Sequence, residues 1–302
     1  MFSVTMSVDK LLGRIVAPDI TIKDANAVDL HDYTHGITSD PLTQFTVVLS
    51  ALIHDVDHCG VSNTQLAEEN PILAQAYKNK SIAEQNSVDI AWEMLMADDM
   101  RELRECIYSD TEELYRFRQT FTKVVLATDI FDKELNDLRQ QRWIMAFSEA
   151  PSTNKQEEIN VKATIVIEHL IQASDVSHTM QHWHIYRKWN SRLFSELYKA
   201  YREGRMGSDP ANSWYKGELG FFDNYIIPLA KKLKECGVFG VSSDEYLSYA
   251  IANREEWEHK GQQIVAEMVE QLQAATTPCQ TNSVIEEIEE EDDDTAIDAA
   301  QV

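Results

Sequence analysis

Apolar residues recur every three or four positions along most of this chain, a spacing that predicts amphipathic helices. The stretch with Phe117, Phe121, Val124 and Val125 is a clear example. No stretch alternates strictly between apolar and polar residues, so we expect an all-α, compact multi-helix domain with no substantial sheet. The expected helices cover residues 4–16, 41–58, 71–78, 81–97, 99–108, 110–130, 132–147, 160–178, 182–204, 213–235 and 242–273.

Capping residues mark two of the helix starts. Asp40 followed by Pro41 combines a cap residue with a proline in the first turn, and Ser81 with Glu84 three residues later forms a capping-box pattern. We expect loops where polar, Gly and Pro residues gather, near residues 17–39, 60–70, 148–158 and 204–212.

The chain is strongly acidic. It has 302 residues, with 27 basic against 51 acidic side chains and a net charge of −24. Residues 284–302 hold many of the acids and no base, so we expect residues 276–302 to form a disordered acidic tail behind a domain spanning residues 1–275. A surface this negative repels phosphate backbones, which argues against nucleic-acid binding.

The four cysteines, Cys59, Cys106, Cys236 and Cys279, are widely scattered. They form no CxxC pair and no short-spaced framework, which is typical of a reducing compartment. No stretch is apolar enough to predict a membrane span, and the N-terminus does not resemble a secretory signal. We therefore expect a cytoplasmic protein or the cytoplasmic part of a larger membrane protein.

Polar side chains follow directly on an apolar segment at residues 45–53, where His54, Asp55 and His58 come next. Burying an ionised carboxylate is costly unless a partner charge or a metal compensates for it. On a helix, residues three or four apart share a face, so these side chains would cluster. Such a cluster suits zinc, manganese, iron or, through oxygens and water, magnesium; the alternative is an ordinary solvated helix end.

A second apolar segment, residues 165–173, leads into Asp175. Asp175 is therefore the candidate to complete the cluster, although a single acid after a hydrophobic helix can equally be solvated. Two such helix ends in one chain strengthen the prediction of a metal site.

Four motifs carry a more specific signal. They are ALIHDVDHCGVSN at residues 51–63, SIAEQNS at 81–87, QASDVSH at 172–178 and GELGFFDNYIIPL at 217–229. In this order and approximate spacing they resemble the catalytic domain of class I 3′,5′-cyclic-nucleotide phosphodiesterases, which are metal phosphohydrolases of the HD type. The resemblance extends over roughly residues 4–273.

The resemblance implies roles for individual residues. His54, Asp55 and Asp175 resemble ligands of the tighter metal, usually zinc, and Asp55 resembles the carboxylate that bridges to a second ion, usually magnesium or manganese. His58 and Glu84 resemble the groups that hold metal-bound waters. Two cations sharing a water lower its pKa, so that hydroxide becomes available to attack phosphorus.

The family also places a His-Asn-x-x-His segment ahead of the helix that matches Val4 onward, and its first histidine protonates the departing 3′ oxygen. The printed sequence begins MFSVTMSV, so we expect an N-terminally shortened copy that lacks this general acid and has impaired turnover. The HDxxH spacing of His31 and His35 is an alternative source, but that stretch resembles a surface loop. We expect the further histidines to be surface or core-edge residues: His178, His182 and His184.

The resemblance also predicts a base pocket. Phe221 matches the phenylalanine that stacks on the purine, and Leu193 roughly matches the aliphatic residue on the other face, with core packing as the alternative for both. The family's base-recognising glutamine corresponds to Glu218. An ionised carboxylate only accepts hydrogen bonds, whereas an amide also donates, so this departure leaves the base preference open.

We therefore expect hydrolysis of cAMP, cGMP or both to the 5′-monophosphate, with Zn²⁺ and Mg²⁺ or Mn²⁺ as cofactors. Fusion to, or association with, a cyclase or receptor domain is a further expectation. One alternative is a non-catalytic phosphodiesterase domain that binds nucleotide or a partner and regulates a neighbouring domain. Another is an HD-type phosphohydrolase for different nucleotides, which the motifs around Glu84 and Phe221 argue against.

Overall fold

The computed structural model describes residues 2–16, 27–147 and 155–276, and these residues contain helices and no strand. The all-α prediction is confirmed. The α-helices are α1 (Phe2–Val16), α2 (Ala27–Tyr33), α3 (Pro41–Ile53), α4 (Asn63–Glu69), α5 (Pro71–Ala76), α6 (Ile82–Met96), α7 (Arg101–Ile107), α8 (Thr111–Leu126), α9 (Lys133–Phe147), α10 (Lys155–Asp175), α11 (Trp183–Arg202), α12 (Trp214–Phe221), α13 (Ile227–Glu235) and α14 (Val241–Thr276). Short 3₁₀ turns lie at Ile37–Ser39, Asp98–Met100, Ser177–Met180 and Pro210–Asn212.

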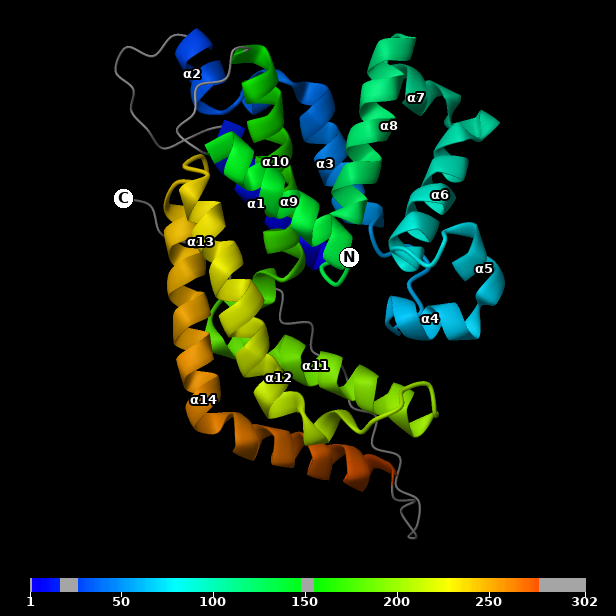
Figure 1. Cartoon of the computed structure of the whole chain (residues 1–302), viewed down its shortest axis with the longest axis vertical. Coiled ribbons are helices and arrows are strands. Elements are labelled where there is room, and N and C mark those ends of the chain that lie inside the picture. The colour runs from blue at the N-terminus through cyan, green and yellow to red at the C-terminus, as the bar shows by residue number, and fades with distance from the viewer. Residues whose placement is uncertain (1, 17–26, 148–154, 277–302) are drawn as a thin grey trace, which may run out of the picture.

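The helices form an upper bundle, a side lobe and a lower layer (Figure 1). In the upper bundle α1 packs on α3 and α10, and α3 packs on α8. Helices α4 to α7 form the side lobe. Helices α11 and α12 and the second half of α14 form the lower layer, while α13 and the first half of α14 run along the left side in Figure 1. Helix α14 contacts α11, α12 and α13. Both α3 and α10 end toward the middle of the molecule, so their C-terminal residues face the region where the three parts meet.

Helix α10 forms the centre of the core. Val166, Leu170, Ile171 and Ala173 have no exposed surface, because α1, α9 and α13 all pack on this helix. A helix segment that is largely apolar around its circumference is stable only when it is surrounded in this way. The apolar segment predicted to precede Asp175 is therefore the most buried part of the fold.

Helices α12 and α13 are joined by a π-helical turn at Phe222–Ile226. Pro228 lies in the first turn of α13 and has no N–H to donate to the carbonyl four residues earlier. The π-helical turn accommodates the missing hydrogen bond without interrupting the helix. The predicted single helix over residues 213–235 is thus three helical segments in one line.

Two expected loops and one expected helix cap also differ from the structure. The expected loops at residues 17–39 and 60–70 contain α2 and α4, and Ser62 caps α4 by accepting a hydrogen bond from the Gln65 N–H. Ser81 precedes α6 in a left-handed conformation and makes no capping bond. Its hydroxyl donates to Asp129 instead, at 2.7 Å. Asp40, by contrast, caps α3 as expected.

Within the described residues, no helix combines the length and the apolar character that crossing a membrane requires. Helix α14 continues to Thr276, slightly beyond the predicted end. The predicted acidic tail lies outside the described residues from position 277 onward.

Candidate functional site

The segment after α3 is a series of tight turns and does not continue the helix to residue 58 as predicted. The helix ends at Ile53, and the Val56 N–H bonds to the Ile53 carbonyl at 2.9 Å. The His58 N–H bonds to the Asp55 carbonyl at 3.1 Å, and Asp57 has a φ of 62°. A non-glycine residue in the left-handed region ends a helix, so His54 and His58 do not share a helical face.

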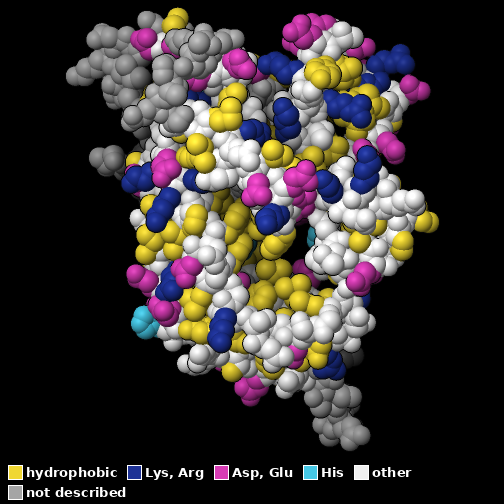
Figure 2. Space-filling model, viewed as in Figure 1, with side chains coloured by type: hydrophobic (Ala, Val, Ile, Leu, Met, Phe, Trp, Pro, Cys, Tyr) yellow, Lys and Arg dark blue, Asp and Glu magenta, His cyan; other side chains and the backbone are white. Residues whose placement is uncertain are grey.

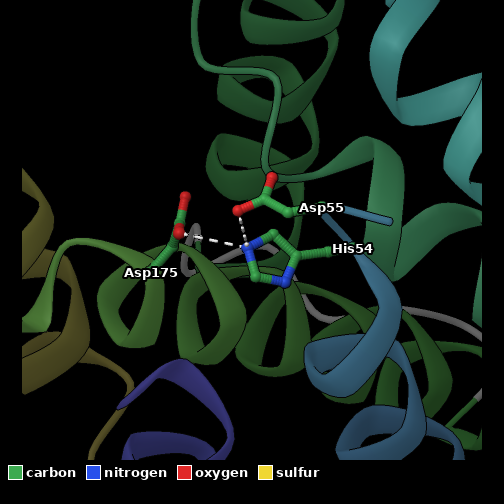
Figure 3. Close-up of side chains that lie close together, drawn as sticks. All are labelled: His54, Asp55 and Asp175. Atoms are coloured by element: carbon green, nitrogen blue, oxygen red, sulfur yellow. Dashed lines mark ion pairs between the residues drawn. The ribbon is translucent and has the colours of Figure 1, made fainter. Parts of the chain in front are cut away.

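His54, Asp55 and Asp175 nevertheless converge (Figure 3). The Nε2 atom of His54 lies 3.1 Å from Asp55 Oδ2 and 3.3 Å from Asp175 Oδ1. One donor atom from each residue lies within 4.8 Å of the others, the only such group of three or more among residues 2–16, 27–147 and 155–276. The C-terminal ends of α3 and α10 thus bring together residues that are more than one hundred positions apart.

The imidazole of His54 directs its Nε2 atom toward the two acids. Its Nδ1 lies 3.0 Å from the Ala51 carbonyl, which can only accept, so Nδ1 carries the hydrogen and Nε2 is left for the carboxylates. Nε2 is buried and close to both oxygens, yet it makes no hydrogen bond of acceptable geometry. Burial lowers the pKa of His54, but the two carboxylates outweigh it and raise the pKa to about 10.

This arrangement fits a divalent cation. A neutral imidazole would direct its lone pair at two negative oxygens, so the group needs a proton or a metal ion between the three atoms. Two ligand atoms at about 2.1 Å from a tetrahedral zinc ion are about 3.4 Å apart, close to the two observed separations. The Ala51 carbonyl on Nδ1 is also the type of outer contact that orients a metal-binding histidine.

His58 interacts electrostatically with both Asp55 and Glu84. Burial raises the pKa of Asp55, but His54 and the charge of His58 lower it more. Burial raises the pKa of Glu84, an effect opposed by the amide of Asn63 and by His58. The side chain of His58 is exposed, and its Nδ1 accepts the Gly60 N–H at 3.2 Å. His58 is therefore outside the three-residue cluster but within electrostatic range of both acids.

Glu84 belongs to a buried polar network that the sequence did not reveal. The Asn63 amide donates to Glu84 Oε2 at 3.0 Å and to Asp129 Oδ2 at 3.4 Å. Its oxygen accepts the Ala83 N–H at 2.9 Å, which fixes the orientation of the amide. Asp129 is only 5% exposed. Asn63 thus holds two acids side by side, one of them the predicted Glu84.

Glu218 lies at the end of a directional chain of hydrogen bonds. The Trp214 indole, which can only donate, bonds to Asn190 Oδ1 at 3.3 Å, so the Asn190 amide nitrogen faces Tyr186. The Tyr186 hydroxyl then donates to Glu218 Oε2 at 2.6 Å. Burial raises the pKa of Glu218, and hydrogen bonds from Tyr186 and Asn190 oppose this rise only in part. The carboxyl therefore holds a proton more tightly than a free glutamic acid.

The other two predicted base-pocket residues lie on different helices. Phe221 on α12 stacks on Tyr225, with ring centroids 5.4 Å apart and planes 14° apart. Leu193 on α11 is 45% exposed. Hydrophobic side chains also gather in a hollow above the lower layer on the face shown in Figure 2.

The other predicted histidines are not members of this cluster. His31 on α2 contacts Ser39 Oγ at 2.6 Å, and both His31 and His35 line a cavity of about 1320 Å³ at the opposite ends of α3 and α10. His182 contacts the Tyr249 hydroxyl at 3.0 Å. Burial lowers the pKa of His178 to about 4, which is typical of a neutral core-edge histidine.

Comparison with known proteins identifies the family. The sequence profile described as 3′5′-cyclic nucleotide phosphodiesterase matches residues 27–238, which is most of the chain. The chain belongs to the 3′,5′-cyclic nucleotide phosphodiesterase family. This family is metal-dependent, and in this phosphodiesterase-family chain the group formed by His54, Asp55 and Asp175 could hold a metal ion.

Curated relatives of this phosphodiesterase domain are distant. The chain is 26% identical to 3′,5′-cyclic-AMP phosphodiesterase 4C of Mus musculus over 221 residues, which are 68% of this chain and 32% of that protein. It is 23% identical to the probable 3′,5′-cyclic phosphodiesterase pde-3 of Caenorhabditis elegans over 80% of this chain and 37% of that protein. The chain thus spans about a third of the length of these relatives.

Solved structures share the fold. The phosphodiesterase domain of Salpingoeca rosetta rhodopsin phosphodiesterase matches with a TM-score of 0.60 at 18% identity, covering 90% of this chain and 84% of that one. A second structure, of the phosphodiesterase domain of the RhoPDE fusion protein from the same choanoflagellate, matches with a TM-score of 0.59 at 19% identity. The phosphodiesterase fold is therefore shared although few residues are identical.

Sequence reasoning missed Asp129, Asn63 and Tyr186 in this phosphodiesterase domain. Asp129 follows an apolar helix that includes Val124 and Val125, which is the same pattern that selected Asp175. The rule that an acid after an apolar helix is a candidate site residue would also have selected Asp129. No sequence signal marks Tyr186. Asn63 is the last residue of the motif at residues 51–63, but its role depends on partners distant in the chain.

Proposed function

We propose that this chain hydrolyses a purine 3′,5′-cyclic nucleotide to the 5′-monophosphate. The observation that carries the proposal is the convergence of His54, Asp55 and Asp175 on one point at the ends of two buried helices. Membership of the phosphodiesterase family supports it, as does the presence of one imidazole nitrogen and two carboxylate oxygens that can bind a metal. Because the chain spans only about a third of its curated relatives, the activity of the whole protein belongs to the same proposal.

His54, Asp55 and Asp175 would hold one divalent cation, with zinc favoured by the mixed nitrogen and oxygen donors, and Asp55 would also reach a second, magnesium or manganese. When bound, the ions would lower the pKa of a shared water and neutralise the phosphate charge. The Ala51 carbonyl keeps the Nε2 lone pair of His54 directed at the site. Glu84 and the exposed His58 would accept and donate hydrogen bonds to water at its edge.

Glu218, Phe221 and Leu193 would bind the base. A purine would stack on the partly buried ring of Phe221, with the aliphatic Leu193 opposite. Burial favours the protonated form of Glu218, and a neutral carboxyl both donates and accepts, as an amide does. Tyr186 already donates to Oε2, so the carboxyl hydrogen would be on Oε1 and available to the base. The carboxyl therefore suits a ring nitrogen or carbonyl that accepts a hydrogen bond.

An activity assay tests the proposal. The chain, supplied with Mn²⁺ and Mg²⁺, is assayed against cAMP and cGMP beside Asp175→Ala, and the metal content of both proteins is measured. We expect turnover and bound metal in the wild-type chain and a loss of both in Asp175→Ala. The proposal would be refuted if the wild-type chain and Asp175→Ala were both inactive and contained equal amounts of metal. Nucleotide binding without any product would favour the non-catalytic alternative instead.

The domain division and the partner are also proposals. The domain over residues 1–275 would be the catalytic unit, with residues 276–302 as an acidic appendage. A structurally similar domain occurs in a rhodopsin phosphodiesterase, which supports the idea that this chain acts beside a receptor or cyclase domain.

A further inference from the structure

The loop that carries the candidate metal ligands is held by side chains from two different parts of the fold. From α6, the Ser87 hydroxyl donates to the Val56 carbonyl at 2.7 Å, and the Asn86 amide donates to Asp57 at 3.1 Å. These contacts fix the first half of the loop to the side lobe. The second half, around Cys59, is held from the lower layer by Arg205.

Arg205 joins three elements at once. It follows the end of α11, where its own N–H bonds to the Ala200 carbonyl at 2.9 Å. Its guanidinium binds both carboxylate oxygens of Glu69 on α4, with Nε and Nη2 at 2.9 and 2.7 Å. The remaining Nη1 donates to the Cys59 carbonyl at 3.3 Å. One side chain therefore connects the lower layer, the side lobe and the metal loop.

The geometry of this contact is specific to arginine. Two parallel N–H groups match a carboxylate, while a third points along the other edge of the plane toward a carbonyl. A lysine offers one point charge and cannot reproduce both contacts together. The side chains of Arg205 and Glu69 are 34% and 30% exposed, so solvent screens the pair only in part.

The loop fits closely at this point. Gly60 has a φ of 73°, and a β-carbon at that position would lie 2.8 Å from Glu196 Oε1. Glu196 is on α11, the helix that also carries Leu193. The loop is thus seated against α11 on one side and tied to Arg205 on the other, so it cannot move far while both contacts persist.

We propose that Arg205 is a positioning residue that sets the affinity of the His54, Asp55 and Asp175 group for a divalent cation by fixing the metal loop through the Cys59 carbonyl. The inference rests on the proposed function only in taking that group as the metal site. Arg205 is not one of the residues proposed to hold the cation or the nucleotide. Removing the Arg205 side chain keeps all three ligand residues in the chain. It lets the loop that carries His54 and Asp55 move away from Asp175.

Titration calorimetry with Mn²⁺ tests the inference without an activity assay. We expect Arg205→Ala to bind Mn²⁺ about 10- to 100-fold more weakly than the wild-type chain, the range typical of groups that orient metal ligands. Arg205→Lys should recover only part of this loss. Lys199→Ala is the matched control, because Lys199 is on the same helix end, forms a long exposed ion pair with Glu203, and does not touch the loop. It should bind Mn²⁺ as the wild-type chain does.

A reversed pair separates the two contacts of Arg205. In Glu69→Arg with Arg205→Glu, the link between α11 and α4 can re-form, but a glutamate cannot donate to the Cys59 carbonyl. We expect the thermal midpoint to recover and the Mn²⁺ affinity to stay low. Recovery of both, or wild-type Mn²⁺ affinity in a folded Arg205→Ala, would overturn the inference.

The outcome also differs from failure of the proposed function. If neither the wild-type chain nor Asp175→Ala binds Mn²⁺, the metal site itself is wrong, and the inference fails with it. If the wild-type chain binds Mn²⁺, Asp175→Ala does not, and Arg205→Ala is unchanged, only the role of Arg205 fails.

Discussion

The buried ring of His169 should make the stability of the domain depend on pH. His169 is 4% exposed, and its Nδ1 contacts the Ile165 carbonyl at 2.8 Å. The carbonyl can only accept, so Nδ1 carries the hydrogen of the neutral ring and protonation would have to occur at Nε2. The ring packs on Trp143 at 4.9 Å. Burial, reinforced by nearby cations such as Lys232, lowers the pKa of His169 from 6.5 to about 4.

The sign and size of the effect follow from this shift. Between pH 6.5 and about 4 the unfolded chain binds a proton that the folded chain does not, so stability falls as the pH falls through this window. A shift of this size corresponds to about 3 kcal/mol in full, of which about 2 kcal/mol is lost between about pH 7.5 and 5. Above about pH 7.5 the ring is neutral in both states and contributes almost no pH dependence.

Urea unfolding of the wild-type chain and His169→Gln at about pH 7.5 and 5 measures this directly. Glutamine cannot take up a proton, so the stability of the variant should fall by about 2 kcal/mol less than that of the wild-type chain. His259→Gln is the matched control, because His259 makes the same contact to the carbonyl four residues earlier but is exposed. Equal losses in wild type and His169→Gln would refute the neutral buried ring.

Three further outcomes are expected. Glu218→Gln should keep cyclic-nucleotide turnover within about threefold near neutral pH and exceed the wild-type rate at high pH, because an amide donates at every pH whereas a carboxyl must stay protonated; turnover abolished at all pH values would contradict this. Arg142→Ala should destabilise the domain by about 2 kcal/mol in urea unfolding, because it leaves Glu168, whose side chain is 5% exposed, without its ion-pair partner. The double variant with Glu168→Gln should regain most of the lost stability in the same assay. Mn²⁺ at about 100 times its dissociation constant should stabilise the chain by about 2.7 kcal/mol in thermal unfolding and leave Asp175→Ala unchanged; an equal response in both would place the ion elsewhere.

The sequence predicted the parts of the site that depend on local apolar patterns. Asp175 could be selected because residues 165–173 are too apolar to be exposed, and the structure buries them completely or nearly so. The helical fold follows from the same periodicity. The roles of His58, Glu84, Glu218, Phe221 and Leu193 stay predictions, since they depend on ligands and assays.

The failures come from contacts between distant residues. Nothing in the local sequence ends α3 before Gly60, yet hydrogen bonds from α6 to Val56 and Asp57 hold the chain in turns. Ser81 has the pattern of a helix cap, but its hydroxyl instead serves Asp129, 48 residues away. A local pattern cannot show whether a hydroxyl will accept from a backbone N–H of its own helix or donate to a carboxylate that only folding brings near.

The π-helical turn at Phe222–Ile226 gives the lower layer some tolerance to chain length. A π-helical turn closes with a hydrogen bond between residues five apart, so it holds about one residue more than an α-helical turn. Deleting one residue within it would restore ordinary α-helical winding and leave Glu218 and Phe221 facing nearly the same side. The same deletion in the regular winding of α13 has no extra residue to remove, so it would turn both side chains by about 100° relative to the end of that helix.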